Sequence, residues 1–186
     1  RRQDKPAMVE CPLESWFAGQ GWSPHDFQRD AWNAYGKGEE VLIQAPTGSG
    51  KTYAGLGAAI REGVRRADAG DQAKGLQLIW IAPIRALTKE IQYSAERMVT
   101  GMGLDWEVGV RTGDTSSKEK ANQRKKMPHI LITTPESLHV MLAMKGVKKR
   151  FGALRLMVVD EWHDLLGTKR GTQVELASAW FRQVAP

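Results

Sequence analysis

The sequence has little of what disulfide-rich, zinc-binding and membrane proteins require. It contains a single cysteine, Cys11, among 186 residues, which excludes internal disulfides and cysteine-based zinc sites. Its longest apolar runs, at 76–82 and 154–159, are far shorter than the roughly 20 residues that a membrane span needs. The first residues carry charge but no apolar stretch typical of a signal peptide. We therefore expect a cytoplasmic protein with no membrane partner.

The overall composition is that of a globular domain. Hydrophobic residues make up 41% of the chain and charged residues 26%, and the length suits one compact domain better than two. We expect a single domain over residues 1–186, in which 1–40 form an N-terminal extension. The net charge of +6 favours a polyanionic partner, because basic side chains release counterions from a phosphate backbone. Proteins that touch no nucleic acid also carry such charge, so the partner stays open on this ground.

Hydrophobic periodicity predicts strands that alternate with helices. Short apolar runs predict strands at 41–44, 76–82, 106–112, 129–134 and 154–159. Helical spacing predicts helices at about 24–36, 51–66, 84–99, 135–144 and 172–184. Because the strands are apolar on both faces, we expect an α/β fold with a mostly parallel sheet and helices on both faces. Ligands collect at the carboxyl ends of strands in such sheets, and the unusual sequences of this chain fall there.

The stretch QAPTGSGKT, residues 44–52, has the residue types of a phosphate-binding loop. Gly48, Ser49 and Gly50 let the backbone curl so that its N–H groups point at an anion, and the following helix adds its positive N-terminus. Ala45 stands where the usual pattern has glycine, at a strand end that requires no positive φ. An ordinary glycine-rich turn is the alternative, but the Lys-Thr pair after the loop favours a nucleotide site.

Two pairs of side chains complete the predicted site. Lys51 can reach the β- and γ-phosphates, and the Thr52 hydroxyl can ligate Mg²⁺. Asp160 and Glu161 follow the strand at 154–159, and successive side chains of an extended strand point to opposite sides, so the two acids are expected to have different roles. Asp160 would hold Mg²⁺ through water opposite Thr52, and Glu161 would polarise the attacking water as general base. The alternative is a pair of solvated acids at a strand end.

These motifs together resemble the first motor domain of a superfamily 2 DEXH-box helicase. The box is DEWH at 160–163. APIRALTKE at 82–90 resembles motif Ia, TGD at 112–114 the short motif that follows, and TTPESL at 133–138 motif Ib. GWSPHDFQ at 21–28 resembles the adenine-reading Q motif. The stretches 16–22 and 160–177 are similar to the large helicase-related (Lhr-type), ligase-associated helicases.

The resemblance implies a RecA-like three-layer fold, ATP and Mg²⁺ as cofactors, and roles for further residues. Gln28, on a Q-motif-like helix, would hydrogen-bond the adenine edge, with Trp22 or Phe17 packing near the base. His163 would relay between the nucleotide and the nucleic-acid side. Lys169 lies with Arg170 in a predicted loop that could touch nucleic acid or dock a neighbouring domain.

Residues at strand-to-helix turns can hold phosphates without reading bases. The candidates for nucleic-acid binding are Pro83, Arg85, Thr88, Thr112, Thr134 and Arg170. Helix capping or surface charge explains each of them equally well, and Thr134 can serve both purposes.

The expected nucleotide-binding residues are Gln28, Thr47, Gly48, Ser49, Gly50, Lys51 and Thr52. The expected catalytic residues are Lys51, Asp160, Glu161 and His163, and the expected Mg²⁺ ligands are Thr52 and Asp160.

We expect the ATP-binding motor domain of an ATP-dependent DNA helicase or translocase that acts on single-stranded DNA, with partners in DNA repair. In this family the arginine that stabilises the transition state comes from a second motor domain of the same chain, which the sequence does not include, so this segment should hydrolyse ATP very slowly. A non-hydrolysing ATP-gated clamp or scaffold and an RNA helicase are the alternatives. A phosphotransferase would need an acceptor site and a lid that the sequence does not indicate.

Overall fold

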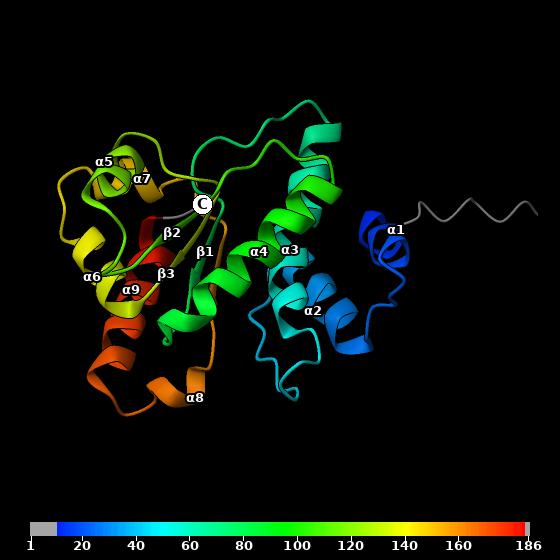
Figure 1. Ribbon diagram of the computed structural model, residues 1–186, viewed down its shortest axis with the longest axis horizontal. Coiled ribbons are helices and arrows are strands. Elements are labelled where there is room, and N and C mark those ends of the chain that lie inside the picture. Colours follow the sequence, from blue (N-terminus) through cyan, green and yellow to red (C-terminus); the bar gives the residue numbers. More distant parts are fainter. Residues whose placement is uncertain (1–10, 185–186) are drawn as a thin grey trace, which may run out of the picture.

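A parallel sheet forms the centre of the computed structural model, which describes residues 11–184 (Figure 1). Within these residues the sheet has the order β2-β3-β1-β4. The strands are β1 (Leu78–Ile81), β2 (Val108–Arg111), β3 (Ile130–Thr133) and β4 (Leu156–Val159). Strands β1 and β3 are buried along their whole length, as expected of parallel strands covered on both faces. Four of the five predicted strands are therefore confirmed.

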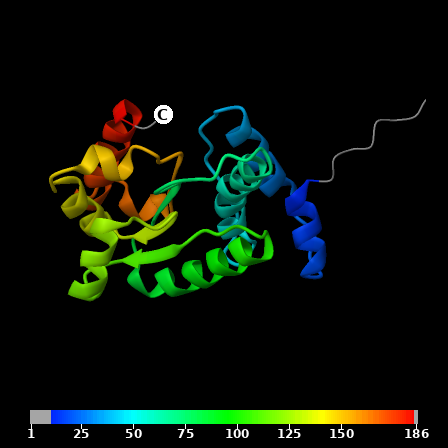
Figure 2. The ribbon, with the colours of Figure 1, turned by 90° about the horizontal axis from the view of Figure 1, so that it is seen from above.

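Helices cover both faces of the sheet and divide the core in two (Figure 2). One face packs on α1 (Pro12–Gly19), α2 (Asp26–Gly36), α3 (Lys51–Asp68) and α4 (Thr88–Gly101). The other packs on α6 (Pro135–Leu142), α7 (Val147–Phe151), α8 (Trp162–Leu165) and α9 (Lys169–Val184). The remaining elements are η1 (Arg85–Leu87) and α5 (Ser117–Lys125). Alternate residues of β1 enter the two cores, with Trp80 in the first and Ile79 in the second, so the three-layer prediction is correct.

The strand predicted at 41–44 is wrong. Residues 39–46 form neither strand nor helix, and Leu42 is 83% exposed. Across from this segment, β4 pairs on one side with β1 and, among the described residues, has no strand on its other side. A cavity of about 1200 Å³ is lined by residues 38–45, by α3 and by β4. An apolar run becomes a strand only when its backbone groups pair with a partner edge, and residues 41–44 do not pair with the open edge of β4.

Tryptophan rings pack against helix glycines on the first face of the sheet. A Cβ atom added to Gly55 of α3 would lie 2.8 Å from Cζ3 of Trp80, closer than real Cβ contacts allow. The pairs that meet in this way are Gly55 with Trp80, Gly57 with Trp32, Gly63 with Trp106 and Gly101 with Trp16. The missing side chains let α3 and α4 lie directly on indole rings, so these glycines set how closely the helices approach the rest of the core.

No helix in the described part of the chain is both long and apolar enough to cross a bilayer.

Candidate active site

The phosphate loop has the backbone geometry that anion binding requires. Gly48 and Gly50 adopt φ of 79° and 89°, in the left-handed region that favours glycine. Gly50 is the N-cap residue of α3, so the first N–H groups of that helix point toward the phosphate loop. The Ser49 hydroxyl is buried and has no hydrogen-bond partner among the described residues. An orphaned hydroxyl beside a helix N-terminus fits a phosphate group, and the loop therefore suits the nucleotide that the sequence predicts.

The side chain of Gln28, a residue of α2, is hydrogen-bonded to the phosphate loop. Its Oε1 accepts a hydrogen bond from the backbone N–H of His25, and its Nε2 donates to the carbonyl oxygen of Gly50, each at 2.8 Å. The side chain is 1% exposed, and a Cβ on Gly50 would lie 2.7 Å from its Nε2. Sequence reasoning did not find this contact, because it joins residues 22 positions apart. A contact between Gln28 and an adenine edge stays a prediction.

The two aromatic candidates for the base occupy different environments. Phe17 is 3% exposed and packs edge-on against Trp16 inside the first core, so it has no free face for a base. Trp22 is 41% exposed, and the Arg97 guanidinium lies over its ring, 4.6 Å from the ring centroid. Of the two, Trp22 remains the candidate for packing near a base.

Lys51 and Glu161 meet across the cleft between the phosphate loop and the end of β4. The Nζ atom of Lys51 lies 3.9 Å from Oε1 of Glu161. Glu161 has φ of 45° and is the one non-glycine residue with positive φ within residues 11–184. The alternation of side chains along a strand therefore does not extend to Glu161, because the backbone leaves the extended conformation there to start α8. Different roles for Asp160 and Glu161 stay a prediction.

Asp160 is held by a hydrogen bond to each of its oxygens. Oδ1 accepts from the backbone N–H of Glu161 at 3.0 Å, and Oδ2 accepts from the indole Nε1 of Trp80 at 3.4 Å. Burial raises the pKa of the Asp160 carboxyl above its ordinary value, and the Trp80 hydrogen bond acts in the opposite direction. The part played by Trp80 carried no signal in the sequence.

The oxygen atoms that the protein offers here suit a Mg²⁺ ion bound jointly by the protein and a nucleotide better than a metal ion held by protein side chains alone. Among the described residues, no group of three or more His, Cys, Asp or Glu side chains is placed to hold a metal. Mg²⁺ is commonly bound by one or two carboxylates together with substrate phosphates and water. Thr52 and Asp160 would supply the protein oxygens in such a site.

His163 contacts the predicted general base from α8. Its Nδ1 lies 3.5 Å from Oε2 of Glu161, and its Nε2 lies 3.2 Å from Oδ1 of Asp164. The imidazole is largely exposed. His163 and Glu161 line the cavity of about 1200 Å³, and so do Lys51 and Asp160. The four predicted catalytic residues therefore share one cleft.

The predicted nucleic-acid motifs are tied to one another by two arginines. Arg170 donates from Nε to Oε1 of Glu136 and from a terminal nitrogen to the carbonyl oxygen of Pro83, both at 2.5 Å. Arg85 forms an exposed ion pair with Asp114 at 3.2 Å. Arg170 and Lys169 belong to the first turn of α9, so the loop expected there is wrong.

The three candidate threonines of these motifs use their hydroxyls within the protein. Thr88 donates to the carbonyl oxygen of Arg85 at 2.7 Å. Thr112 accepts from the N–H of Asp114 at 3.3 Å, and Thr134 caps α6 by accepting from the N–H of Ser137 at 3.4 Å. All three are buried. Helix capping is thus observed for Thr134, whereas Thr88 and Thr112 bond to backbone groups of nearby turns. Contact of any of the three with a nucleic-acid backbone stays a prediction.

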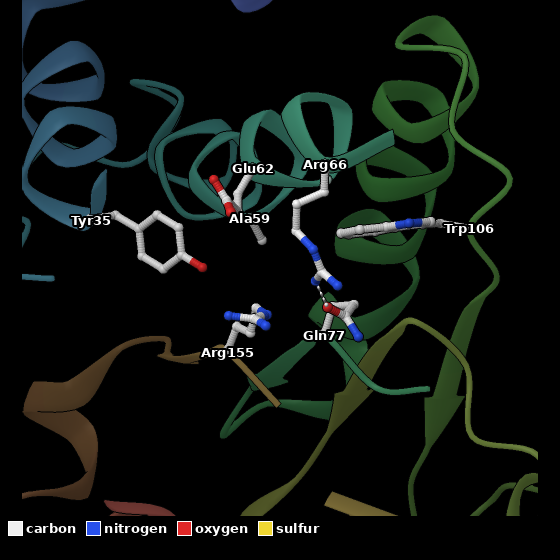
Figure 3. A pocket seen from close by; sticks show the side chains of 8 residues that line it. Tyr35, Ala59, Glu62, Arg66, Gln77, Trp106 and Arg155 are labelled. Carbon is white, nitrogen blue, oxygen red and sulfur yellow. Dashed lines mark hydrogen bonds between the residues drawn. The ribbon is translucent and has the colours of Figure 1, made fainter. Parts of the chain in front are cut away.

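A second cavity lies at the opposite end of the sheet (Figure 3). It is lined by Tyr35, Glu62, Arg66, Gln77 and Arg155, among others, and Arg66 donates to Oε1 of Gln77 at 3.1 Å. Its volume of about 10 Å³ is at the lower limit for one water molecule. Gln77 and Arg155 precede β1 and β4, so this polar cluster supports the amino ends of the strands and is no candidate for the nucleotide site.

The parallel sheet, the glycine-rich loop at the start of α3 and the acids after β4 define a P-loop nucleotide-binding domain. The particular family follows from comparison with known proteins. The chain belongs to the DEAD/DEAH box helicase family, whose sequence pattern matches residues 25–184.

Two named relatives refine this placement. The chain is 39% identical over 180 residues to the ATP-dependent helicase Lhr-Core protein 2 of Thermococcus barophilus, covering 91% of this chain and 21% of that protein. It is 32% identical over 186 residues to the Lhr helicase/uracil glycosylase of Escherichia coli, covering 92% of this chain and 12% of that protein. This chain therefore spans about a fifth or less of these relatives, and it is close to the Lhr-type helicases that the sequence motifs indicated.

Solved structures confirm the fold. A structure of Mycobacterium smegmatis helicase Lhr bound to ssDNA and AMP-PNP matches with a TM-score of 0.82 and 32% identity, covering 95% of this chain and 23% of that one. The DEAD-box helicase Mss116 matches with a TM-score of 0.80 and 20% identity, covering 97% of this chain and 36% of that one. The RecA-like fold of a superfamily 2 first motor domain is thereby confirmed.

Proposed function

We propose that this chain is the ATP-binding motor domain of an ATP-dependent DNA helicase or translocase that acts on single-stranded DNA. The observation that carries the proposal is the approach of Lys51 to Glu161, 3.9 Å apart, beside a phosphate loop with an orphaned hydroxyl. Family membership supports it, as does the likeness to an Lhr structure described as bound to ssDNA and AMP-PNP.

Each residue of the cleft has a role that its position supports. Lys51 would leave Glu161 and bind the terminal phosphates, which carry more charge than a single carboxylate. Glu161, released from the lysine, would orient and deprotonate the attacking water. Thr52 and Asp160 would hold Mg²⁺, which neutralises charge that develops on the phosphates. His163, in contact with Glu161, would sense the nucleotide and report it toward the nucleic-acid edge.

The nucleic-acid edge would hold a strand by its backbone. Arg85 and the helix N-termini after β1 and β3 are suited to phosphates and read no bases, which predicts little sequence preference and strong dependence on salt. DNA is favoured over RNA because the Lhr structure similar to this chain is described with ssDNA. A role in DNA repair, repair partners and a cytoplasmic location follow from the sequence resemblance and composition and stay predictions.

Full activity would require a second motor domain. We expect residues 1–186 to form one domain, as the sequence predicts. The second motor domain would donate an arginine that raises the rate of ATP hydrolysis by about 10³–10⁵-fold. The 186-residue chain should therefore bind Mg²⁺·ATP weakly and hydrolyse it very slowly.

Calorimetric titration with Mg²⁺·ATP and steady-state ATPase measurements with and without single-stranded DNA test the proposal. Lys51→Ala is the matched variant, because it removes the phosphate-binding amine and leaves the loop backbone in place. We expect binding by the parent chain and none by Lys51→Ala. Equal binding by both, or DNA-stimulated turnover as fast as that of an intact motor, would contradict the proposal.

A further inference from the structure

Trp80 connects two parts of the nucleotide site that lie far apart in the sequence. It is the third residue of the central strand β1, and it is 2% exposed. Its indole Nε1 donates to Oδ2 of Asp160, a residue 80 positions further along the chain. Asp160 follows β4, the strand that pairs with β1, and Trp80 lies opposite Val158 in that pairing. Val158 and Asp160 are two residues apart, so the ring and the carboxylate share one face of the sheet.

The same ring supports the helix that follows the phosphate loop. A Cβ on Gly55 would lie 2.8 Å from Cζ3 of Trp80 and 3.2 Å from its Cη2. Gly55 comes four residues after Lys51, about one helical turn. Because the ring touches helix backbone on one side and Asp160 on the other, the position of the indole N–H relative to the phosphate loop is fixed by packing.

The hydrogen bond from Trp80 restricts how the Asp160 carboxylate can turn. Oδ1 accepts from the Glu161 N–H and Oδ2 from the indole, so each oxygen has one donor and keeps acceptor capacity for water or metal. Partners that orient a metal-binding carboxylate typically change metal affinity by about 10–100-fold when they are removed.

We infer that Trp80 is a positioning residue for the metal–nucleotide site: its indole N–H orients Asp160, and its contact with Gly55 sets the distance between that carboxylate and the phosphate-loop helix. The inference rests on the proposed function. Trp80 acts through Asp160 and needs no contact of its own with the nucleotide or the metal.

Trp80→Phe tests the inference, because phenylalanine keeps an aromatic ring in the core and removes the N–H donor. Trp32→Phe is the matched control: Trp32 is 1% exposed, lies against Gly57 of the same helix, and donates its Nε1 hydrogen bond to the backbone oxygen of Tyr53 at 3.2 Å. The readout is the affinity for a fluorescent ATP analogue, measured by anisotropy in EDTA and over a series of Mg²⁺ concentrations, together with the melting temperature.

We expect Trp80→Phe to need about tenfold more Mg²⁺ than the parent chain for half-maximal tightening of nucleotide binding, with its affinity in EDTA unchanged. Trp32→Phe should lower the melting temperature and leave the Mg²⁺ requirement where it was. A Trp80→Phe protein with the parental Mg²⁺ requirement would overturn the inference. So would a loss of affinity that is equal with and without metal, since that is the mark of a merely structural role.

If Trp80→Phe does not fold, 3-benzothienylalanine at position 80 replaces it, because sulfur takes the place of the N–H in a ring of nearly the same shape. The same Mg²⁺ shift is expected, and its absence counts against the inference. A parent chain that binds no nucleotide at any Mg²⁺ concentration overturns the proposed function as well. A parent chain with Mg²⁺-dependent binding and an isostere that behaves identically overturns only the role of Trp80.

Discussion

The side-chain amide of Gln28 donates a hydrogen bond to the carbonyl oxygen of Gly50, and in this way α2 holds the residue from which α3 begins. The same carbonyl accepts from the N–H groups of Tyr53 and Ala54 in the first turn of the helix. The entry angle of the phosphate loop into α3 is therefore set by a residue outside the loop.

Gln28→Glu should weaken both the fold and the nucleotide site. The carboxylate can still accept from the His25 N–H but cannot donate to Gly50, so the carbonyl oxygen of Gly50 then faces a carboxylate oxygen that is itself buried. We expect the free energy of unfolding in urea to fall by about 1–3 kcal/mol. Gln72→Glu, at an exposed position, is the control and should change neither stability nor binding.

Binding of inorganic tripolyphosphate separates the two roles of Gln28. If the side chain holds the loop, Gln28→Glu lowers the affinity for tripolyphosphate and for ATP alike, and this is the expected result. A loss confined to ATP would mean instead that Gln28 acts only on the adenine.

Glu161→Gln should separate nucleotide binding from turnover. The amide keeps the size of the side chain, removes the general base and frees Lys51 from its carboxylate partner. Turnover measured under single-turnover conditions should fall by about 10²–10⁴, while affinity for Mg²⁺·ATP is kept or increases. Glu175→Gln on the exposed surface of α9 is the control. An ATP-gated clamp would show no change in turnover with either variant, because it would have none to lose.

Substitutions of Arg85 and of Asp114 should have opposite effects on the affinity for single-stranded DNA. Asp114 neutralises Arg85 in the structure, and both side chains are largely exposed. Arg85→Ala should weaken binding and reduce the slope of log affinity against log salt concentration by about 0.7, the value for one phosphate contact on a single strand. Asp114→Asn should strengthen binding at low salt, because it releases the arginine.

Fluorescence anisotropy over a range of salt concentrations measures both slopes. Lys118→Ala on α5 is the control for loss of one exposed charge. A slope that Arg85→Ala leaves unchanged would remove Arg85 from the nucleic-acid edge.

Asp160→Asn should stabilise the chain at neutral pH. The folded state binds the Asp160 proton more tightly than the unfolded state, because burial raises the pKa of this carboxyl in the fold. The free energy of unfolding therefore falls as pH rises from the ordinary aspartate pKa through the raised folded pKa, and at neutral pH the whole cost of the buried charge is present.

Urea unfolding of the parent and of Asp160→Asn between acidic and neutral pH measures this contribution. The variant should be more stable at neutral pH, and the difference should vanish below the ordinary aspartate pKa, where both side chains are neutral. Asp30→Asn, at an exposed position of α2, should show no such trend. A variant that is less stable than the parent at neutral pH would contradict the sign.

The elements that sequence reasoning placed correctly are those whose signal is local. Apolar runs located β1 to β4, and the Lys-Thr and Asp-Glu pairs located the cleft, because each pattern is read within a few residues. The failures depend on contacts between distant segments. Residues 41–44 have the composition of a strand, but strand pairing needs an edge that composition does not reveal. The left-handed backbone of Glu161 and the Trp80 hydrogen bond likewise depend on how β4 meets its neighbours.

The glycines beneath the tryptophan rings have a consequence for how the chain folds. Gly55, Gly57 and Gly63 all lie within α3, and each lowers intrinsic helix stability by about 1 kcal/mol relative to alanine. Such a segment would be mostly unstructured as an isolated peptide. We expect it to become helical only as Trp80, Trp32 and Trp106 dock against it, so that the end of α3 next to the phosphate loop forms together with the body of the domain.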